Sequence, residues 1–281
     1  MRREVEGRQR RIEKMRIAVV NNEKGSSVTI RNRFLTAIEG TEVVYDEKNP
    51  DMIVSIGGDG TLLEAFHRYV DRLDKVRFIG IHTGHLGFYT DWQVEELEDF
   101  IPFLLNDSGE SISYPLLEVR LAHEDGKVEK MIALNEATIR RIEGTMTGEV
   151  FIKEDKFELF KGDGLCISTP TGSTGLNKSL GGAVVHPRLD TLQMTEIASL
   201  NNRVYRTLSS PLLIAGDEWF HVRLDDAYLE GVMMTLDHLN FSLKGVRDIE
   251  FRLAKERVHF ARYRHMHFWN RVETAFIGWK E

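Results

Sequence analysis

Residues 51–61 read Asp-Met-Ile-Val-Ser-Ile-Gly-Gly-Asp-Gly-Thr, and the rest of the chain is organised around this stretch. Residues 52–56 form a short apolar run rich in β-branched side chains, which is typical of a strand buried on both faces. The run ends at three glycines and Asp59, and Thr61 then opens a segment with helical spacing as its predicted N-cap. The stretch therefore predicts a strand, a tight glycine turn and a helix.

The glycine turn has the chemistry of a phosphate-binding loop that contains one carboxylate. Gly57, Gly58 and Gly60 let backbone N–H groups approach a ligand with no Cβ in the way, and the helix N-terminus favours negative charge. Because a carboxylate repels phosphate, Asp59 must either coordinate a metal or take the proton from a hydroxyl that attacks phosphorus. The structural alternative is an ordinary strand-to-helix turn in which Asp59 is a local cap.

The composition is that of an acidic globular protein. The 281 residues are 42% hydrophobic and 29% charged, and the net charge is −7. Such a chain repels a nucleic-acid backbone, so we predict no nucleic-acid partner. No apolar stretch is long enough to span a bilayer or to form a signal peptide, which predicts a cytoplasmic protein without a membrane partner. The single cysteine, Cys166, lies in an apolar run and is predicted to be buried.

The first 110 residues alternate predicted strands and helices. This alternation predicts βαβ units and a Rossmann-like parallel sheet, whose ligands bind at the carboxyl ends of strands, where Asp59 lies. Phe88 and Tyr89 follow the next strand, and they either form an aromatic wall for a flat base or pack under a loop. We predict strands at residues 17–20, 43–45, 52–56 and 78–81, and helices at residues 28–39, 62–70 and 94–105.

His82 and His85 are three residues apart, but the glycines around them favour a loop and no third ligand type is close. We therefore predict that the protein alone holds no metal. The charged residues 1–14 are predicted to form a solvated extension.

The pattern changes to hairpins after Asp107-Ser108-Gly109. It predicts an α/β domain at residues 1–110 and an all-β, sandwich-like domain at residues 111–264. We predict strands at residues 112–121, 130–139, 149–152, 156–160, 165–169, 212–214, 219–224, 232–236, 248–253 and 258–263.

Two helices are predicted outside this pattern. Residues 191–202 have apolar side chains at helical spacing within the β region. The tail is predicted to contain a closing helix at residues 268–277. The apolar stripe of this helix is predicted to dock on the core, and it consists of Phe268, Trp269, Val272 and Phe276.

Three stretches of the β region carry more polar chemistry than a sandwich needs. Asn135 and Glu136 end an apolar run, and an amide beside a carboxylate can bind ribose hydroxyls. Residues 161–164, Lys-Gly-Asp-Gly, repeat the glycine–carboxylate theme. Residues 169–179, Thr-Pro-Thr-Gly-Ser-Thr-Gly-Leu-Asn-Lys-Ser, offer many hydroxyl and backbone donors, but they are not a P-loop because Asn177 precedes the lysine.

The motifs Gly-Gly-Asp-Gly-Thr, Asn-Glu, Gly-Asp-Gly and Thr-Pro-Thr-Gly-Ser-Thr occur in an order that resembles the NAD kinase family. The resemblance runs from about residue 17 to the C-terminal helix. It implies that the tail, residues 265–281, completes the first domain and that its helix packs back on that domain. Residues 199–207 and Phe268-Trp269 are similar to the smaller enzymes of Gram-positive bacteria. Diacylglycerol-type lipid kinases share only the first motif, and they are the alternative enzyme class. A non-catalytic dinucleotide-binding module in which Asp59 is inert is the other alternative.

The resemblance implies transfer of a phosphoryl group from ATP, or from polyphosphate, to the 2′-hydroxyl of the adenosine ribose of NAD, which gives NADP. It implies Mg²⁺ bound with ATP, and self-association as a dimer or tetramer in which another subunit completes the crevice. Asp59 would be the base, Gly57, Gly58, Gly60 and Thr61 would lie near the phosphates, and Asn135 and Glu136 would hold a ribose. The NAD site would also include Phe88, Lys161, Asp163, Thr174, Gly175, Leu176, Asn177, Lys178 and Ser179.

The chain departs from the family pattern at two positions. Leu176 replaces a frequent tyrosine, which removes a stacking surface worth ~1 kcal/mol. Lys161 replaces a frequent arginine and loses its bidentate fork.

Overall fold

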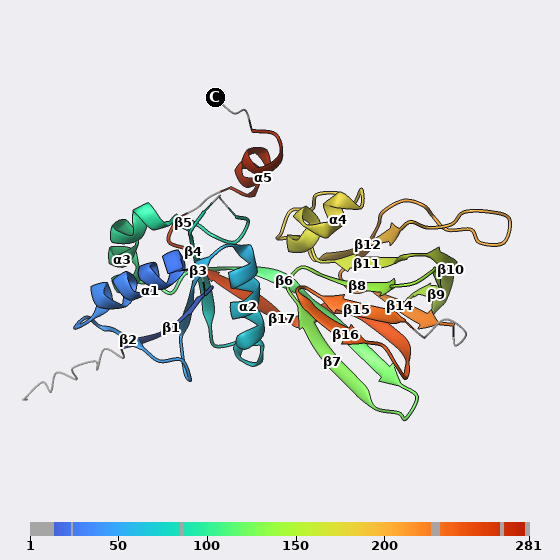
Figure 1. Ribbon diagram of the computed structural model, residues 1–281, viewed down its shortest axis with the longest axis horizontal. Coiled ribbons are helices and arrows are strands. Elements are labelled where there is room, and N and C mark those ends of the chain that lie inside the picture. The colour runs from blue at the N-terminus through green and yellow to red at the C-terminus, as the bar shows by residue number, and fades with distance from the viewer. Residues whose placement is uncertain (1–13, 24, 85–86, 226–230, 265–266, 279–281) are drawn as a thin grey trace, which may run out of the picture.

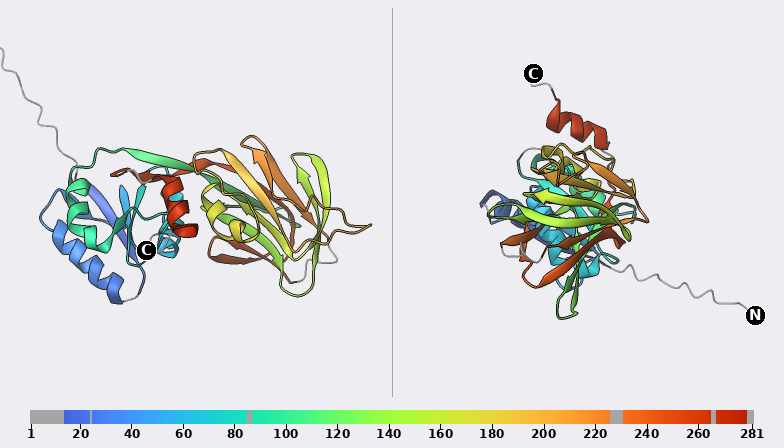
Figure 2. Two further views of the ribbon diagram at one scale, coloured as in Figure 1. Left: turned by 90° about the horizontal axis from the view of Figure 1, so that it is seen from above. Right: turned by 90° about the vertical axis from the view of Figure 1, so that its right-hand side faces the viewer.

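A computed structural model of the chain describes residues 14–23, 25–84, 87–225, 231–264 and 267–278. Figure 1 shows an α/β part beside a β-rich part, with helix α5 above the junction, and Figure 2 confirms this position of α5 from two further directions. The predicted fold class, a parallel α/β domain followed by a sandwich-like β domain, is confirmed. The predicted solvated extension lies almost entirely outside the described residues.

The α/β part is a parallel sheet with helices on both faces. Its strand order is β2-β1-β3-β4-β5. Ile17 and Val19 pack with α1 (Gly25–Ile38) and α3 (Leu97–Leu105), whereas Ala18 and Val20 face α2 (Asp59–Arg68), as the period of two requires. The strands are β1 (Met15–Asn21), β2 (Val43–Tyr45), β3 (Met52–Gly57), β4 (Arg77–His82) and β5 (Trp92–Gln93), and the 3-10 turns are η1 (Val70–Arg72) and η2 (Val94–Glu96).

The β-rich part consists of two facing layers with one apolar core between them. Phe160, Phe220 and Phe251 from the first layer share this core with Ile139 and Met234 from the second. The first layer contains β6 (Ser111–His123), β7 (Val128–Ala133), β9 (Met146–Ile152), β10 (Asp155–Gly162), β14 (Trp219–Leu224) and β17 (Val246–Ala261). The second has the order β13-β12-β11-β8-β15-β16, with β8 (Glu136–Arg141), β11 (Gly164–Ser168), β12 (Thr191–Ile197), β13 (Leu212–Ala215), β15 (Val232–Leu236) and β16 (Leu239–Ser242).

β17 joins the two parts into one sheet. It pairs with β6 and β14 in the β-rich part, and its end pairs in parallel with β4, where Phe260 lies opposite Phe78. The resulting sheet has 11 strands. The sequence predicts two separate strands at residues 248–253 and 258–263, but the ladder with β6 continues across a bulge between Leu253 and Arg257.

Two other predictions about elements are wrong. Residues 191–197 form strand β12 and not a helix, because β11 and β13 pair with it on both sides and both of its faces are covered. Gln193 and Thr195 are therefore about as buried as their apolar neighbours Leu192 and Met194, which hides the period of two. The predicted strand at residues 130–139 is interrupted, because β7 and β8 belong to different sheets.

α5 (Phe268–Phe276) packs back on the α/β part through a polar side chain rather than through its apolar stripe. Arg271 is the buried residue of this helix, while Trp269 and Phe276 are 54% and 41% exposed. The Arg271 guanidinium donates hydrogen bonds to the carbonyl oxygens of Gly87, Phe88 and Thr90. The predicted core docking of the stripe is therefore wrong. In the described part of the chain no helix is long and apolar enough to cross a membrane.

Candidate active site

The glycine turn lies at the carboxyl end of β3, and α2 begins within it at Asp59. Gly58 is the N-cap, with no side-chain capping bond, so the prediction that Thr61 caps the helix is wrong. Thr61 lies in the first turn, and its hydroxyl fills the space beside Gly57, where an added Cβ would come within 2.1 Å of Thr61 Oγ1. Beside Gly58 and Gly60 an added Cβ would meet no atom within 4 Å. The backbone there is open to a ligand at a helix N-terminus.

Asp59 is held by the backbone of the segment that follows β4. Its Oδ2 accepts a hydrogen bond from the Phe88 N–H at 2.9 Å, and its Oδ1 accepts one from the Tyr89 N–H at 3.2 Å. Gly87 permits this approach, because a Cβ there would lie 2.2 Å from Asp59 Oδ1. These bonds fix the carboxylate but leave lone pairs for a further donor. Asp59 is therefore not the cap of its own helix.

Tyr89 connects this carboxylate to the predicted Asn–Glu pair. Its hydroxyl makes a short hydrogen bond to Asn135 Oδ1. Burial, followed by the negative charges of Asp59, Asp237 and Glu136, raises the pKa of the Tyr89 hydroxyl, which therefore stays protonated and is the donor. Asp59 and Asn135 thus lie on either side of one buried tyrosine, as the sequence interpretation requires.

Glu136 is a half-buried acid with one oxygen that is buried and has no hydrogen-bond partner among the described residues. Its Oε2 is inaccessible and unbonded among the described residues, and an added Cβ at Gly175 would lie 3.6 Å from it. Burial and the nearby charge of Asp237 raise the pKa of the Glu136 carboxyl to about 8. A protonated carboxyl at this position can both donate to and accept from a ligand hydroxyl.

Asp237 is a central residue of the site that the sequence interpretation missed. Its buried carboxylate accepts hydrogen bonds from the N–H groups of Leu134 at 2.9 Å, Asn135 at 2.7 Å and Glu136 at 3.3 Å. His67, on the same helix as Asp59, lies 2.7 Å from Asp237 Oδ2 through its Nε2. Asp237 therefore joins α2 to the turn that carries Asn135 and Glu136. The only sequence signal is the two-residue turn between β15 and β16, where Asp tolerates its φ of 52°.

The hydroxyl-rich stretch is ordered and folds over the Asn135 backbone. Thr169 donates to Leu134 O through Oγ1 and to Asn135 O through its N–H. Gly172 lies so close that an added Cβ would be 2.2 Å from Asn135 O. The stretch continues as two short helical turns, η3 (Thr171–Thr174) and α4 (Leu176–Ser179). The stretch therefore holds the backbone of the turn that carries Asn135 and Glu136 in place.

The predicted NAD-binding residues of this stretch differ in exposure. Asn177 is fully buried, where it accepts a hydrogen bond from Thr195 Oγ1 at 2.7 Å, and Thr174 is also buried. Gly175, Lys178 and Ser179 are exposed, and Leu176 is half-buried. Asn177 thus holds α4 in place, and α4 presents its other residues outward.

Phe88 already has an aromatic neighbour. Its ring stacks on the Phe276 ring of α5 with centroids 5.7 Å apart. The Lys178 ammonium lies 4.1 Å from the centroid of the same Phe276 ring. Phe88 therefore packs in a small cluster with Phe276 of α5 and Lys178 of α4. This packing does not decide whether Phe88 also forms a wall for a base.

Lys161 and Asp163 lie away from the Asn–Glu pair within one chain. In the ladder of β8 and β11, Ser168 pairs with Glu136 at one end and Gly164 pairs with Arg140 at the other. Asp163 comes just before Gly164 and is five residues from Ser168, so it lies about 16 Å from the Glu136 end of the ladder. The Lys161 ammonium lies 4.7 Å above the Tyr205 ring.

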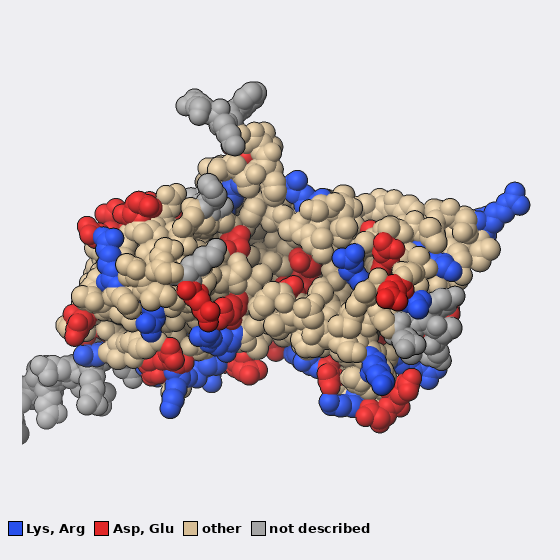
Figure 3. Space-filling model, viewed as in Figure 1, with Lys and Arg blue, Asp and Glu red and all other residues tan. Residues whose placement is uncertain are grey.

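The two parts of the chain enclose a hollow, which Figure 3 shows below α5 with acidic side chains on its walls.

Among the described residues no group of three or more His, Cys, Asp or Glu side chains could hold a metal. His82 is buried and accepts the Gly84 N–H on Nδ1, while His85 lies outside the described residues. Cys166 is buried, as predicted.

Comparison with known proteins identifies the family. The ATP-NAD kinase N-terminal domain matches residues 4–108, and the ATP-NAD kinase C-terminal domain matches residues 134–237. The NAD kinase of Lacticaseibacillus paracasei is 55% identical over 266 residues, which are 95% of this chain and 100% of that protein. The chain belongs to the ATP-NAD kinase family. The NAD kinase of Latilactobacillus sakei is 51% identical, over 95% of this chain and 99% of its own.

Solved structures agree with this family in fold. Yeast NADH kinase, in complex with NADH, has a TM-score of 0.81 at 17% identity and covers 95% of this chain and 89% of its own. An NAD kinase from Archaeoglobus fulgidus, in complex with ATP, has a TM-score of 0.71 at 24% identity and covers 93% and 97%. The predicted resemblance to NAD kinases of Gram-positive bacteria is confirmed, and with it the enzyme class, a phosphotransferase with an alcohol acceptor. The lipid-kinase alternative has no support.

Proposed function

We propose that this ATP-NAD kinase transfers the γ-phosphoryl group of ATP to the 2′-hydroxyl of the adenosine ribose of NAD and releases ADP and NADP. The arrangement that supports this best is the Asp59 carboxylate, fixed by two backbone N–H groups at the tip of α2 and connected through Tyr89 to Asn135. A hydroxyl held between them can lose its proton to Asp59 while the open helix N-terminus faces the phosphates.

The steps of the reaction follow from these positions. Asn135 and Glu136 bind ribose hydroxyls, and Asp59 accepts the 2′-hydroxyl proton as the new O–P bond forms. The bond between the γ-phosphorus and the bridging oxygen breaks, and ADP leaves with the electron pair. Gly57, Gly58, Gly60 and Thr61 lie beside the transferred group, so most of the rate enhancement would come from positioning and charge neutralisation.

A divalent metal, for which Mg²⁺ is the natural candidate, fits the open space beside Gly58 and Gly60 when it is bound with ATP. Mg²⁺ usually keeps several waters and binds phosphate oxygens of the substrate, so it needs no cage of protein ligands and leaves Asp59 available as the base. The metal would screen the charge of the phosphates when it is bound with ATP. The residues of the chain position the sugar and accept the proton.

The dinucleotide would extend along α4 past Phe88, with Thr174, Gly175, Leu176, Lys178 and Ser179 on its path. Asn177 would act by holding α4. Because Lys161 and Asp163 lie at the far end of the β8–β11 ladder, we propose that a second copy of the chain brings them to this site. A dimer or tetramer would supply them. The division into domains at residue 110 and a cytoplasmic location likewise stay predictions.

A coupled assay for NADP formation tests the proposed function. Purified enzyme with NAD and Mg²⁺ is given ATP, polyphosphate or no donor, and NADP is followed with an NADP-specific dehydrogenase. We expect NADP only when a donor is present, and with ATP among the active donors. Absence of NADP with ATP would overturn the proposal, and the polyphosphate arm decides whether polyphosphate is a second donor.

The half-buried acid Glu136 predicts a pH-dependent stability. Its pKa is about 8 in the folded protein against an ordinary 4.5, so the folded state holds a proton that the unfolded state has released between these values. The free energy of unfolding should therefore fall as pH rises from 4.5 to 8, by an amount on the order of 3–5 kcal/mol. Glu136→Gln keeps the shape of the protonated acid and should remove this fall.

Urea unfolding of ligand-free wild type and Glu136→Gln at pH 6 and pH 9 measures the effect. We expect the free energy of unfolding of wild type to fall from pH 6 to pH 9 more than that of Glu136→Gln. Glu143→Gln, an exposed acid in the same part of the chain, is the control and should follow wild type. Parallel pH curves for wild type and Glu136→Gln would contradict the prediction.

A further inference from the structure

A second pocket lies on the other side of the segment that holds Asp59. Its volume is about 260 Å³, and it is bounded by the residue 88–91 segment, the start of β6, the end of β17, α5 and residues 186–188. Asp59, Asn135 and Glu136 do not line it. Tyr89 does, so this tyrosine separates the pocket from the proposed active site.

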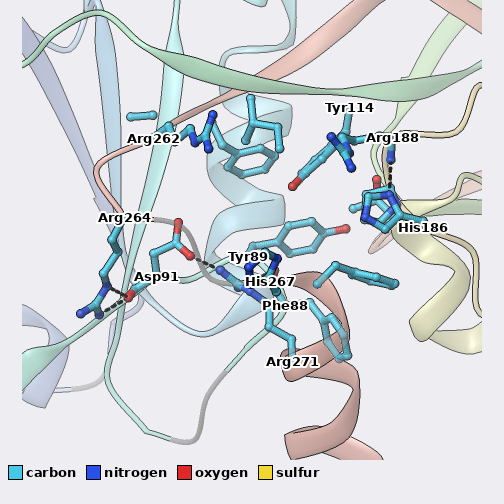
Figure 4. A pocket seen from close by; sticks show the side chains of 16 residues that line it. Phe88, Tyr89, Asp91, Tyr114, His186, Arg188, Arg262, Arg264, His267 and Arg271 are labelled. Atoms are coloured by element: carbon cyan, nitrogen blue, oxygen red, sulfur yellow. Dashed lines mark hydrogen bonds and ion pairs between the residues drawn. The ribbon is translucent and has the colours of Figure 1, made fainter.

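The walls of the pocket carry an excess of positive charge in a protein whose net charge is −7. Four arginines line it, namely Arg188, Arg262, Arg264 and Arg271. Arg264 is neutralised by Glu96, and Arg271 by Asp91. Arg188 and Arg262 have no ion-pair partner among the described residues. Figure 4 shows Arg262 and Arg264 on one side of the pocket and Arg188 with His186 on the other.

The positive charge of Arg188 affects the ionisation of His186, which also lines the pocket. Burial first and Arg188 second lower the pKa of His186. His186 is therefore neutral at physiological pH, which leaves the two arginines as the surplus cations. The His186 ring lies edge-on to Phe268 of α5 with centroids 5.4 Å apart, so His186 packs against α5.

Aromatic rings form the rest of the wall, from Phe88, Tyr89, Tyr114, Phe260 and Phe268. Tyr89 is stacked on Phe260 with an interplanar angle of 11°, and these flat surfaces suit a flat ligand ring. Guanidinium groups match phosphate oxygens through paired N–H donors. The volume equals that of roughly nine waters, which is more than a bare phosphate fills. The ligand that satisfies both features is an anion with an aromatic ring.

We propose that this pocket is a second binding site for a nucleoside phosphate, with the base among the aromatic rings and the phosphate on Arg188 and Arg262. The ligand would touch both parts of the chain, because Arg188 belongs to the β-rich part and α5 and the residue 88–91 segment to the α/β part. It would contact Phe88 and Tyr89, whose backbone N–H groups fix Asp59. This site adjoins the proposed path of the dinucleotide at Phe88, but Asp59, Asn135 and Glu136 do not line it.

Calorimetric titration of the NAD-saturated enzyme without a phosphoryl donor tests this site, with AMP, adenosine and inorganic phosphate as the three probes. We expect AMP to bind once per chain, and adenosine and phosphate to bind roughly tenfold more weakly or worse, because each lacks one half of the ligand. Adenosine binding as tightly as AMP would overturn the phosphate assignment, and phosphate binding as tightly as AMP would overturn the base assignment.

Two variants locate the binding. Arg188→Gln and Arg262→Gln should each weaken AMP binding by about tenfold, since each removes a charge-assisted contact. Arg247→Gln, an exposed arginine on β17 outside the pocket, should bind AMP like wild type. The rate of NADP formation should be the same in all three variants, which shows that they are folded. Unchanged AMP affinity in both pocket variants, or no AMP binding to the NAD-saturated wild type, would overturn the proposal.

Discussion

Replacement of Asp59 by Asn should lower the turnover number for NADP formation by about 10²–10⁴-fold and leave the affinity for NAD within a few fold. The amide keeps the shape of the carboxylate but cannot take a proton from the 2′-hydroxyl. NAD affinity should persist, because the ribose contacts that we assign to Asn135 and Glu136 do not involve Asp59. The result is a loss of kcat at a nearly constant KM for NAD.

Initial rates and direct titration with NAD measure the two quantities separately. Asp59 also accepts two backbone hydrogen bonds, so the melting temperature of Asp59→Asn must be recorded alongside. Asp71→Asn, an exposed acid at the other end of the same helical segment, is the matched control and should behave as wild type. If Asp59→Asn kept more than a tenth of the wild-type turnover, Asp59 would not be the base.

Asp237→Ala should cost about 3–5 kcal/mol of folding stability and remove most of the activity. The change leaves three buried backbone N–H groups, of Leu134, Asn135 and Glu136, without their acceptor, and it deprives His67 of its partner. A loss of this size is a large fraction of the 5–15 kcal/mol that stabilises a typical domain. Activity should fall because the ribose-binding pair loses its fixed position relative to α2.

Backbone strain must be separated from the lost hydrogen bonds, because Asp237 has a φ of 52° that alanine disfavours. Asp237→Gly accommodates this φ but has no carboxylate, and it should be about as damaging as Asp237→Ala. Asp237→Asn keeps one acceptor oxygen and tolerates the φ, and it should recover part of the loss. Urea unfolding of the three variants, with exposed Asp74→Ala as control, gives the comparison. A nearly wild-type Asp237→Gly would show that strain, and not the carboxylate, governs the result.

Elements with a strong local pattern were predictable from sequence. The run before Gly57 predicts β3 because both of its faces are apolar, and the helical spacing after it predicts α2. β12 was not predictable, because Gln193 and Thr195 are buried under α4 and the loop that follows it, and no alternation survives. A strand with polar groups on a covered face cannot be distinguished from a helix by periodicity alone.

The candidate site divides in the same way. Asp59, Asn135 and Glu136 belong to dense motifs, and the structure brings them together around Tyr89. Asp237 is a single acid in a hairpin turn, where aspartate is common for conformational reasons, so no pattern distinguishes it. The separation of Asp163 from Glu136 was equally unpredictable, because motif order along a chain carries no distance between motifs.

The shared strand β17 limits where the chain can be cut into fragments that fold. The stretch encoding residues up to 110 contains every parallel strand of the first half except the one that covers β4, and that strand arrives from residues 246–261. A fragment cut at residue 110 would expose a hydrophobic sheet edge beside Phe78 and would tend to aggregate. We therefore expect the two parts to fold well only when they are expressed together as one chain.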